Sequence, residues 1–153
     1  GSMLTQIPSG LNEIIHTFGS IDDPKFEAEN IVSFNFPYTL RYAGQPVTRS
    51  RCHKLAIDNF VTAFDLIKAA GLEDLVMEFN GIYNRRPIRG YESHPSTHSW
   101  GIAIDVDASH FKLGSVARLP DGIVNCFRKA GFFYGGDFKG RKDPMHFQLA
   151  VNY

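Results

Sequence analysis

Apolar side chains recur every three or four residues in three stretches of the chain, residues 11–18, 57–67 and 123–130. This spacing places them on one face of a helix, and a glycine follows each stretch, as is common where helices end. The pattern therefore predicts three amphipathic helices, of which the one over 57–67 has the longest apolar stripe.

Apolar and polar side chains alternate at 75–79, 102–107 and 146–151, which is typical of strands. Residues 31–42 are also predicted to be extended, as two segments that Pro37 separates. Loops are expected over 22–30 and 80–95, with turns at 43–46 and at Gly135 and Gly136.

Helices and strands follow one another without a regular strand-helix-strand rhythm. This order favours an α+β fold, with a mostly antiparallel central sheet and helices packed on it. In the predicted strands 102–107 and 146–151, the polar side chains share the face opposite the apolar row. One face of each strand is therefore expected to meet the core and the other a cleft.

The length of 153 residues predicts one domain over 4–153, after a tag remnant at 1–3. Sixteen Lys and Arg residues balance sixteen Asp and Glu residues, so no basic field favours nucleic acid as a partner. No apolar run reaches the roughly 18 residues of a membrane span, and no secretory signal is evident, although a leader could have been trimmed. Cys52 and Cys126 lie far apart, so any metal is expected on histidines and carboxylates.

Two histidines and two aspartates accompany the strands with polar faces. Six residues separate His98 and Asp105, and Asp143 stands three positions before His146. If the two strands are neighbours, the four side chains converge on one face. A catalytic zinc site needs three N or O ligands, an open position for water and a base near that water. The four residues offer a candidate for each part.

Small and rigid residues around these positions suit such a site. Gly101 would let the backbone turn tightly ahead of the strand, and Ala103 would leave room beside Asp105. Pro144 would hold its loop extended, which would place Asp143 beside the metal without making it a fourth ligand.

The pattern SxHxxGxAxD is complete in this chain, and DPMHF follows at 143–147. Together they resemble the zinc peptidoglycan peptidases of the D-alanyl-D-alanine carboxypeptidase and L-alanyl-D-glutamate endopeptidase family, which includes bacteriophage endolysins. The resemblance extends through 80–89 and the GGDF of 135–138. It implies a hedgehog/DD-peptidase-like fold, one zinc ion per chain and hydrolysis of an amide bond in the peptidoglycan stem peptide. The fixed positions of the first pattern are Ser96, His98, Gly101, Ala103 and Asp105.

Carried over position by position, the resemblance implies that His98, Asp105 and His146 bind zinc and that Asp143 activates the water. An upstream arginine of this family is thought to stabilise the oxyanion. A guanidinium suits that role because it stays charged and donates several hydrogen bonds. The candidates, in order of preference, are Arg86 and Arg89, and Arg85 competes with them.

The residues at 83–90 and 135–147 look more like the phage-type L-alanyl-D-glutamate endopeptidases, with a D-alanyl-D-alanine carboxypeptidase or dipeptidase as the alternative. Such an endolysin or tail lysin acts on the bacterial cell wall, either released from the cytoplasm by lysis or carried on the phage particle. Two other classes are a non-catalytic zinc-containing binding module on the same fold and a non-haem iron oxygenase. Asp143 and its nearby arginine argue against the first, and the wide spacing of His98 and Asp105 argues against the second.

Further residues are candidates for substrate contact or for support of the metal ligands. His53 is expected to serve packing or a helix end, and the other histidines outside the motif are expected to be ordinary surface or core residues. The candidates are Arg89, Ser96, Trp100, Asp107, Tyr134 and Asp137.

Overall fold

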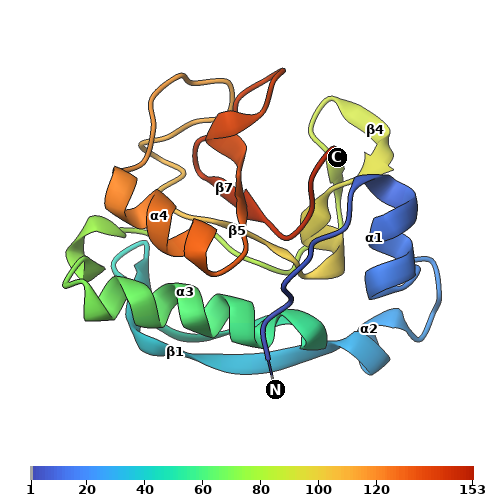
Figure 1. Ribbon diagram of the computed structural model, residues 1–153, viewed down its shortest axis with the longest axis horizontal. Helices are drawn as coiled ribbons and strands as arrows, with labels where there is room; N and C mark the ends of the chain where they lie inside the picture. Colours follow the sequence, from blue (N-terminus) through green and yellow to red (C-terminus); the bar gives the residue numbers. More distant parts are fainter. Residues whose placement is uncertain (1) are drawn as a thin grey trace.

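The computed structural model describes residues 2–153 and combines helices with small antiparallel sheets, which confirms the α+β prediction (Figure 1). The α-helices are α1 (Gly10–Phe18), α2 (Phe26–Asn30), α3 (Ile57–Ala69) and α4 (Asp121–Lys129), and the 3₁₀ helices are η1 (Lys54–Ala56), η2 (Glu73–Leu75), η3 (Thr97–Trp100) and η4 (Gly135–Asp137). The strands are β1 (Ile31–Tyr42), β2 (Gln45–His53), β3 (Pro87–Ile88), β4 (Tyr91–Pro95), β5 (Ala103–Asp105), β6 (Phe133–Tyr134) and β7 (His146–Gln148).

The strands form three separate sheets in place of the expected single central one. β1 pairs with β2, β3 pairs with β4, and the third sheet has the order β5-β7-β6. All of these pairings are antiparallel. In the third sheet, Asp105 lies opposite His146 and Ala103 lies opposite Gln148. The predicted strands around 102–107 and 146–151 are therefore neighbours, although both are shorter than expected.

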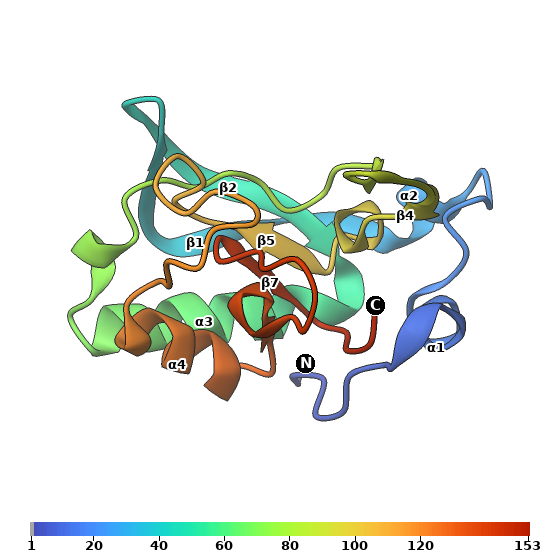
Figure 2. The same cartoon turned by 90° about the horizontal axis from the view of Figure 1, so that it is seen from above.

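Helix α3 lies between the β1-β2 hairpin and α4, and Figure 2 shows the same arrangement from above. Phe36 of β1 meets Phe64 of α3 with ring centroids 5.0 Å apart, and Phe64 meets Phe127 of α4 at 5.6 Å. Phe127 then stacks on Phe147 of β7 at 4.0 Å. Burial of each phenylalanine contributes about 1.5–3 kcal/mol. This column of rings therefore fixes β7, and the polar face that it presents, against the helices.

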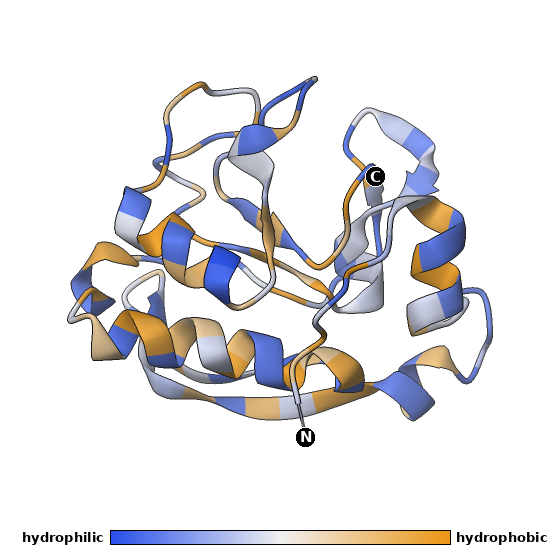
Figure 3. Ribbon diagram, in the orientation of Figure 1, coloured by the Kyte–Doolittle hydropathy of each residue, from blue (hydrophilic) through white to orange (hydrophobic). Residues whose placement is uncertain are grey.

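The apolar residues of the helices follow the predicted stripes, as the hydropathy colouring in Figure 3 illustrates along α3 and α4. The buried positions of α3 include Phe60, Phe64 and Ile67, and those of α4 include Ile123 and Phe127. None of the helices in residues 2–153 is long and apolar enough to cross a membrane.

The predicted strand at 75–79 is wrong. Its first residue belongs to η2, and only Phe79 forms an isolated bridge, with Val106. The backbone N–H groups of Met77 and Glu78 donate to Asp107 Oδ1, at 2.9 and 2.7 Å. The Asp107 side chain thus accepts from the backbone N–H groups that would otherwise pair with a neighbouring strand.

Three other segments differ from their sequence predictions. The expected loop over 22–30 contains α2, the expected loop over 80–95 contains the β3-β4 hairpin, and β2 was not predicted. Pro37 does not separate two strands, because β1 runs through it with a shift in register between Asn35 and Leu40. The irregular register accommodates the residue that cannot donate a ladder hydrogen bond.

Candidate metal centre and active site

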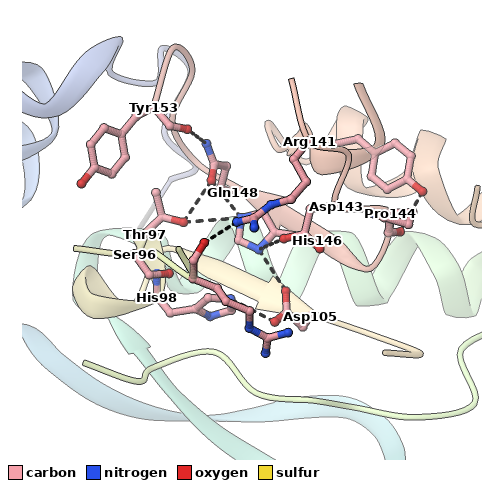
Figure 4. A network of polar contacts seen from close by, with 12 residues as sticks. Ser96, Thr97, His98, Asp105, Arg141, Asp143, Pro144, His146, Gln148 and Tyr153 are labelled. Atoms are coloured by element: carbon pink, nitrogen blue, oxygen red, sulfur yellow. Dashed lines mark hydrogen bonds and ion pairs between the residues drawn. The ribbon is translucent and has the colours of Figure 1, made fainter. Parts of the chain in front are cut away.

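Three side chains from β5, β7 and η3 converge at one end of the third sheet (Figure 4). The pairing of Asp105 with His146 across β5 and β7 puts His146 Nδ1 2.9 Å from Asp105 Oδ1. His98 Nε2 lies 3.2 Å from Asp105 Oδ2. One N or O atom from each of the three residues lies within 4.8 Å of the others. The convergence expected from the sequence is therefore present.

Hydrogen bonds on the far side of each imidazole set its tautomer. His98 Nδ1 lies 2.7 Å from Ile82 O, and since a carbonyl oxygen only accepts, Nδ1 carries the proton. His146 Nε2 lies 2.8 Å from Gln148 Oε1 and donates to it in the same way. The lone pairs of His98 Nε2 and His146 Nδ1 consequently point at Asp105, which is the orientation of metal-binding imidazoles.

Gln148 is itself held in one orientation. Its Nε2 donates to Ala150 O at 3.1 Å and to Tyr153 O at 3.2 Å, so its Oε1 must face His146. Thr97 Oγ1 donates to the same Oε1 at 3.0 Å. The two backbone carbonyls and the Thr97 hydroxyl therefore hold the Gln148 amide in the orientation in which its oxygen accepts from His146.

The three donors fit a divalent cation. His98 Nε2 is buried and has no hydrogen-bond partner among the described residues. Two imidazole lone pairs and a carboxylate would repel one another unless a positive charge lay between them. Two nitrogens and one carboxylate, with a fourth direction open to a cleft, are a donor set typical of catalytic zinc.

Asp105 is in direct contact with both imidazoles of this cluster. Burial by itself would raise the pKa of Asp105, but His98 and His146 outweigh it and hold that pKa below its usual range. Burial opposes protonation of His146, yet the adjacent carboxylate of Asp105 outweighs burial and raises the pKa of this histidine. Asp105 is therefore a carboxylate ready to bind a cation.

Asp143 lies beside the three donors without joining them. Its Oδ2 is 3.9 Å from His146 Nδ1, and its Oδ1 is buried without a hydrogen-bond partner among residues 2–153. Burial, supported by the charge of Asp105, raises the pKa of Asp143 above its ordinary value. A half-buried carboxyl group with a raised pKa has the properties of a general base or acid.

The turn that carries Asp143 is anchored from below. Asp143 N donates to Gly135 O at 3.0 Å, and His146 N donates to Asp143 O at 3.1 Å. The hydroxyl of buried Tyr134 donates to Pro144 O at 2.8 Å. Tyr134 thus supports the turn rather than lining the cleft.

Among the three arginine candidates, Arg86 lies nearest the cluster, with its Nη2 3.9 Å from Asp105 Oδ2. Its backbone is held on both sides, since Arg86 N donates to Ser99 Oγ and Arg86 O accepts from Ser96 N. Arg85 points elsewhere and donates to Ile21 O at 2.6 Å. Arg89 also lines the cleft, and no ion pair with Asp105 or Asp143 is seen for it among the described residues.

The cleft in front of the cluster has a volume of about 400 Å³. Ser96, Arg86 and Arg89 line it, together with Tyr91 and Arg141. Ser96 also caps η3, because its Oγ accepts from His98 N at 3.2 Å. Ser96 therefore lies both at the wall of the cleft and at the start of η3.

Three other candidates lie outside this cleft. Trp100 is buried and donates from Nε1 to Gly19 O at 2.9 Å, and Tyr134 has the supporting position described above. Asp137 pairs with Arg118 and Arg128 instead of facing the metal cluster. Trp100, Tyr134 and Asp137 are therefore placed for structural contacts, and none of them is among the residues that line the cleft.

Asp107 and His53 also have structural contacts. Asp107 faces the backbone of Met77 and Glu78, as described above. His53 is buried, with Nε2 2.8 Å from Phe18 O and Nδ1 accepting from Leu55 N at the start of η1. The helix-end role expected for His53 is the one that it has.

Sequence reasoning missed Gln148, Thr97 and Arg141 as site residues. Gln148 carried a signal, because it shares the strand face of His146. Thr97 stood inside the motif at a variable position, and Arg141 had no signal at all, since a loop brings it to the cleft.

An α+β fold with two imidazoles and a carboxylate around one point, and a second carboxylate beside them in a cleft, is typical of metal-dependent hydrolases. Within that class, residues 89–149 match the family model described as D-alanyl-D-alanine carboxypeptidase, whose members depend on zinc. The match supports the resemblance drawn from the motif and indicates a zinc metallopeptidase that acts on peptidoglycan. A comparison with curated proteins gives no match, and neither does a comparison with solved structures.

Proposed function

We propose that this peptidase is an L-alanyl-D-glutamate endopeptidase of the endolysin or tail-lysin type, which cuts the stem peptide of the bacterial cell wall. In this proposal, His98, Asp105 and His146 hold one zinc ion, Asp143 moves the proton and Arg86 stabilises the oxyanion. The observation that carries the proposal is the convergence of three metal-binding donors with Asp143 beside them.

The metal would supply Lewis-acid chemistry, lowering the pKa of a water molecule and polarising the scissile carbonyl. Asp143 is the base that takes the proton of that water. Its Oδ2 lies on the side that faces His146. Its raised pKa makes it a better proton acceptor than an exposed aspartate and lets it return the proton to the leaving amine.

Arg86 binds the oxygen that gains negative charge as the carbonyl is attacked. Its guanidinium borders both the cluster and the cleft, so it can donate to an oxygen held there. Such preorganised donors contribute most where water is excluded. The contacts of its backbone with Ser96 and Ser99 keep this donor in place.

Two alternatives follow from other observations. The description of the matching family favours a D-alanyl-D-alanine carboxypeptidase, which would remove the last residue of the stem peptide. A non-catalytic zinc-containing module would need no base, and the unpartnered Asp143 Oδ1 and its raised pKa argue against that reading.

Mass spectrometry of fragments released from defined muropeptides tests the proposal, because the new N-terminus identifies the bond that is cut. We expect fragments that begin with D-glutamate and about one zinc per chain. Asp143→Asn should keep its zinc but lose about 10²–10⁴-fold in kcat. His98→Ala should lose both zinc and activity.

Arg128→Gln is the matched control, since Arg128 pairs with Asp137 away from the cleft. It should keep both zinc and activity. Release of free D-alanine alone would replace the endopeptidase by the carboxypeptidase. Full activity of the metal-free protein would overturn the zinc mechanism.

A further inference from the structure

The cleft carries an excess of cationic side chains. The whole chain has equal numbers of basic and acidic residues. In contrast, four basic side chains line the cleft, and its two acidic ones are the carboxylates already assigned to metal binding and proton transfer. The basic residues are Arg86, Arg89, Lys139 and Arg141, and the acidic ones are Asp105 and Asp143.

Arg141 lines this cleft and connects two of the segments around it. It stands in the loop between η4 and β7, and its Nη2 donates to Arg89 O in the β3-β4 hairpin. Its Cζ lies 5.8 Å from the ring centroid of Tyr91 in the same hairpin. The carbonyl and the ring hold the guanidinium in place and leave most of its donors for a ligand.

No carboxylate of residues 2–153 forms an ion pair with Arg141. Four arginines outside the cleft are neutralised in this way, by Glu27, Asp22 or Asp137. They are Arg51, Arg85, Arg118 and Arg128. Arg141 is thus an oriented cation without a carboxylate partner among residues 2–153, in the lining of the cleft in front of the candidate metal centre.

We propose that Arg141 determines specificity by binding a free carboxylate of the substrate peptide, next to the scissile amide. This inference rests on the proposed function, because it places a stem peptide in the cleft. A planar guanidinium recognises a carboxylate through two parallel hydrogen bonds, whereas a neutral amide offers only one acceptor and no charge. The enzyme should therefore prefer peptides with a free D-glutamate carboxylate over their amidated D-isoglutamine counterparts.

The test compares two stem peptides that differ only in that carboxylate or amide. We expect the wild-type protein to cleave the acid with a kcat/KM at least about tenfold higher. Arg141→Gln should raise the KM for the acid and leave the amide almost unchanged, so that the preference disappears. Arg141→Lys should retain part of the preference for the acid, and Arg128→Gln should retain all of it.

Direct binding separates this inference from the proposed function. Calorimetry with Asp143→Asn, which should bind without cutting, should show tighter binding of the acid, and adding Arg141→Gln should abolish the difference. Cleavage of both peptides at equal rates, or equal loss of both in Arg141→Gln, would overturn the carboxylate subsite alone. Cleavage of neither peptide would overturn the proposed function. In that case, tighter binding of the acid would still support the carboxylate subsite, and equal binding of the two peptides would overturn it.

Discussion

Gln148 shows how a residue that touches no substrate can decide what a metal ligand does. Its amide accepts from His146 Nε2 while both of its own N–H groups are used by backbone carbonyls. It is 2% exposed, so water cannot take over the contact. Hydrogen-bond partners of this kind orient imidazole ligands and raise their basicity.

Gln148→Leu should therefore weaken zinc binding by about 10–100-fold, because His146 Nε2 would lose its acceptor at 2.8 Å and keep only the longer contact with Thr97 Oγ1 at 3.4 Å. Competition with a chromophoric chelator measures the affinity without relying on activity. Asn152→Ala, which removes an exposed side chain that donates only to Ser9 Oγ, is the control. An unchanged affinity in Gln148→Leu would show that the amide does not position the ligand.

At the scale of the elements, the site depends on a tight passage from η3 to β5. Gly101 makes this passage with φ +71°, and a Cβ on it would lie 2.7 Å from His53 N. The same backbone is tied by a hydrogen bond from His53 N to Gly101 O at 2.9 Å. Gly101 is therefore required both for its conformation and for the close approach of β2.

Gly44 has the same kind of backbone conformation as Gly101 but no close neighbour, so it serves as a comparison. It has φ +78°, but a Cβ there would meet nothing within 4 Å. Gly44→Ala should lower the free energy of unfolding by about 1 kcal/mol from backbone strain alone. Gly101→Ala should cost at least about 1–3 kcal/mol more, because β2 must also move. Urea unfolding of both variants tests this, and equal losses would contradict the close approach.

At the scale of the whole molecule, the metal is expected to tie separate parts of the chain together. The candidate ligands come from η3, β5 and β7, so binding to the folded state alone stabilises that state. Zinc at about 100 times its Kd adds about 2.7 kcal/mol, which corresponds to a rise in Tm of about 5–10 °C for this length. Thermal unfolding with and without a chelator should show this shift, and His98→Ala should not.

The pH dependence of stability should carry a contribution from His53, which links β2 to the end of α1. Burial, with some help from Lys54, lowers the pKa of His53 below 6.5. Well above pH 6.5 the histidine is neutral in both states and adds no pH dependence. As the pH falls below 6.5, the unfolded chain takes up a proton that the folded protein refuses, so the free energy of unfolding falls.

Urea unfolding at several pH values isolates this contribution. The difference in unfolding free energy between the wild type and His53→Gln should shrink as the pH falls from 7.5 to 5, by at most about 1.4 kcal/mol per pH unit. His16→Gln, at an exposed histidine, serves as the control. A difference that stays constant over this range would contradict a buried neutral His53.

Features that depend on local spacing could be predicted from the sequence. The helical stripes of α3 and α4 and the alternation in β5 and β7 were readable because each element fixes the direction of its own side chains. The same rule put Asp105 and His146 on the polar faces of their strands. The family motif, whose residue types and spacing are local features as well, then indicated which side chains are the candidate ligands.

Only the tertiary structure decided which elements meet. Asp107 accepts from the backbone of the segment predicted as a strand, which is irregular in the structure. Arg85 donates to Ile21 O, whereas Arg86 lies beside Asp105 of the cluster. The loop before β7 places Arg141 in the lining of the cleft. Each outcome depends on a contact between residues far apart in the chain. Periodicity fixes where a side chain points along its own element, but chain closure and core packing determine what it then faces.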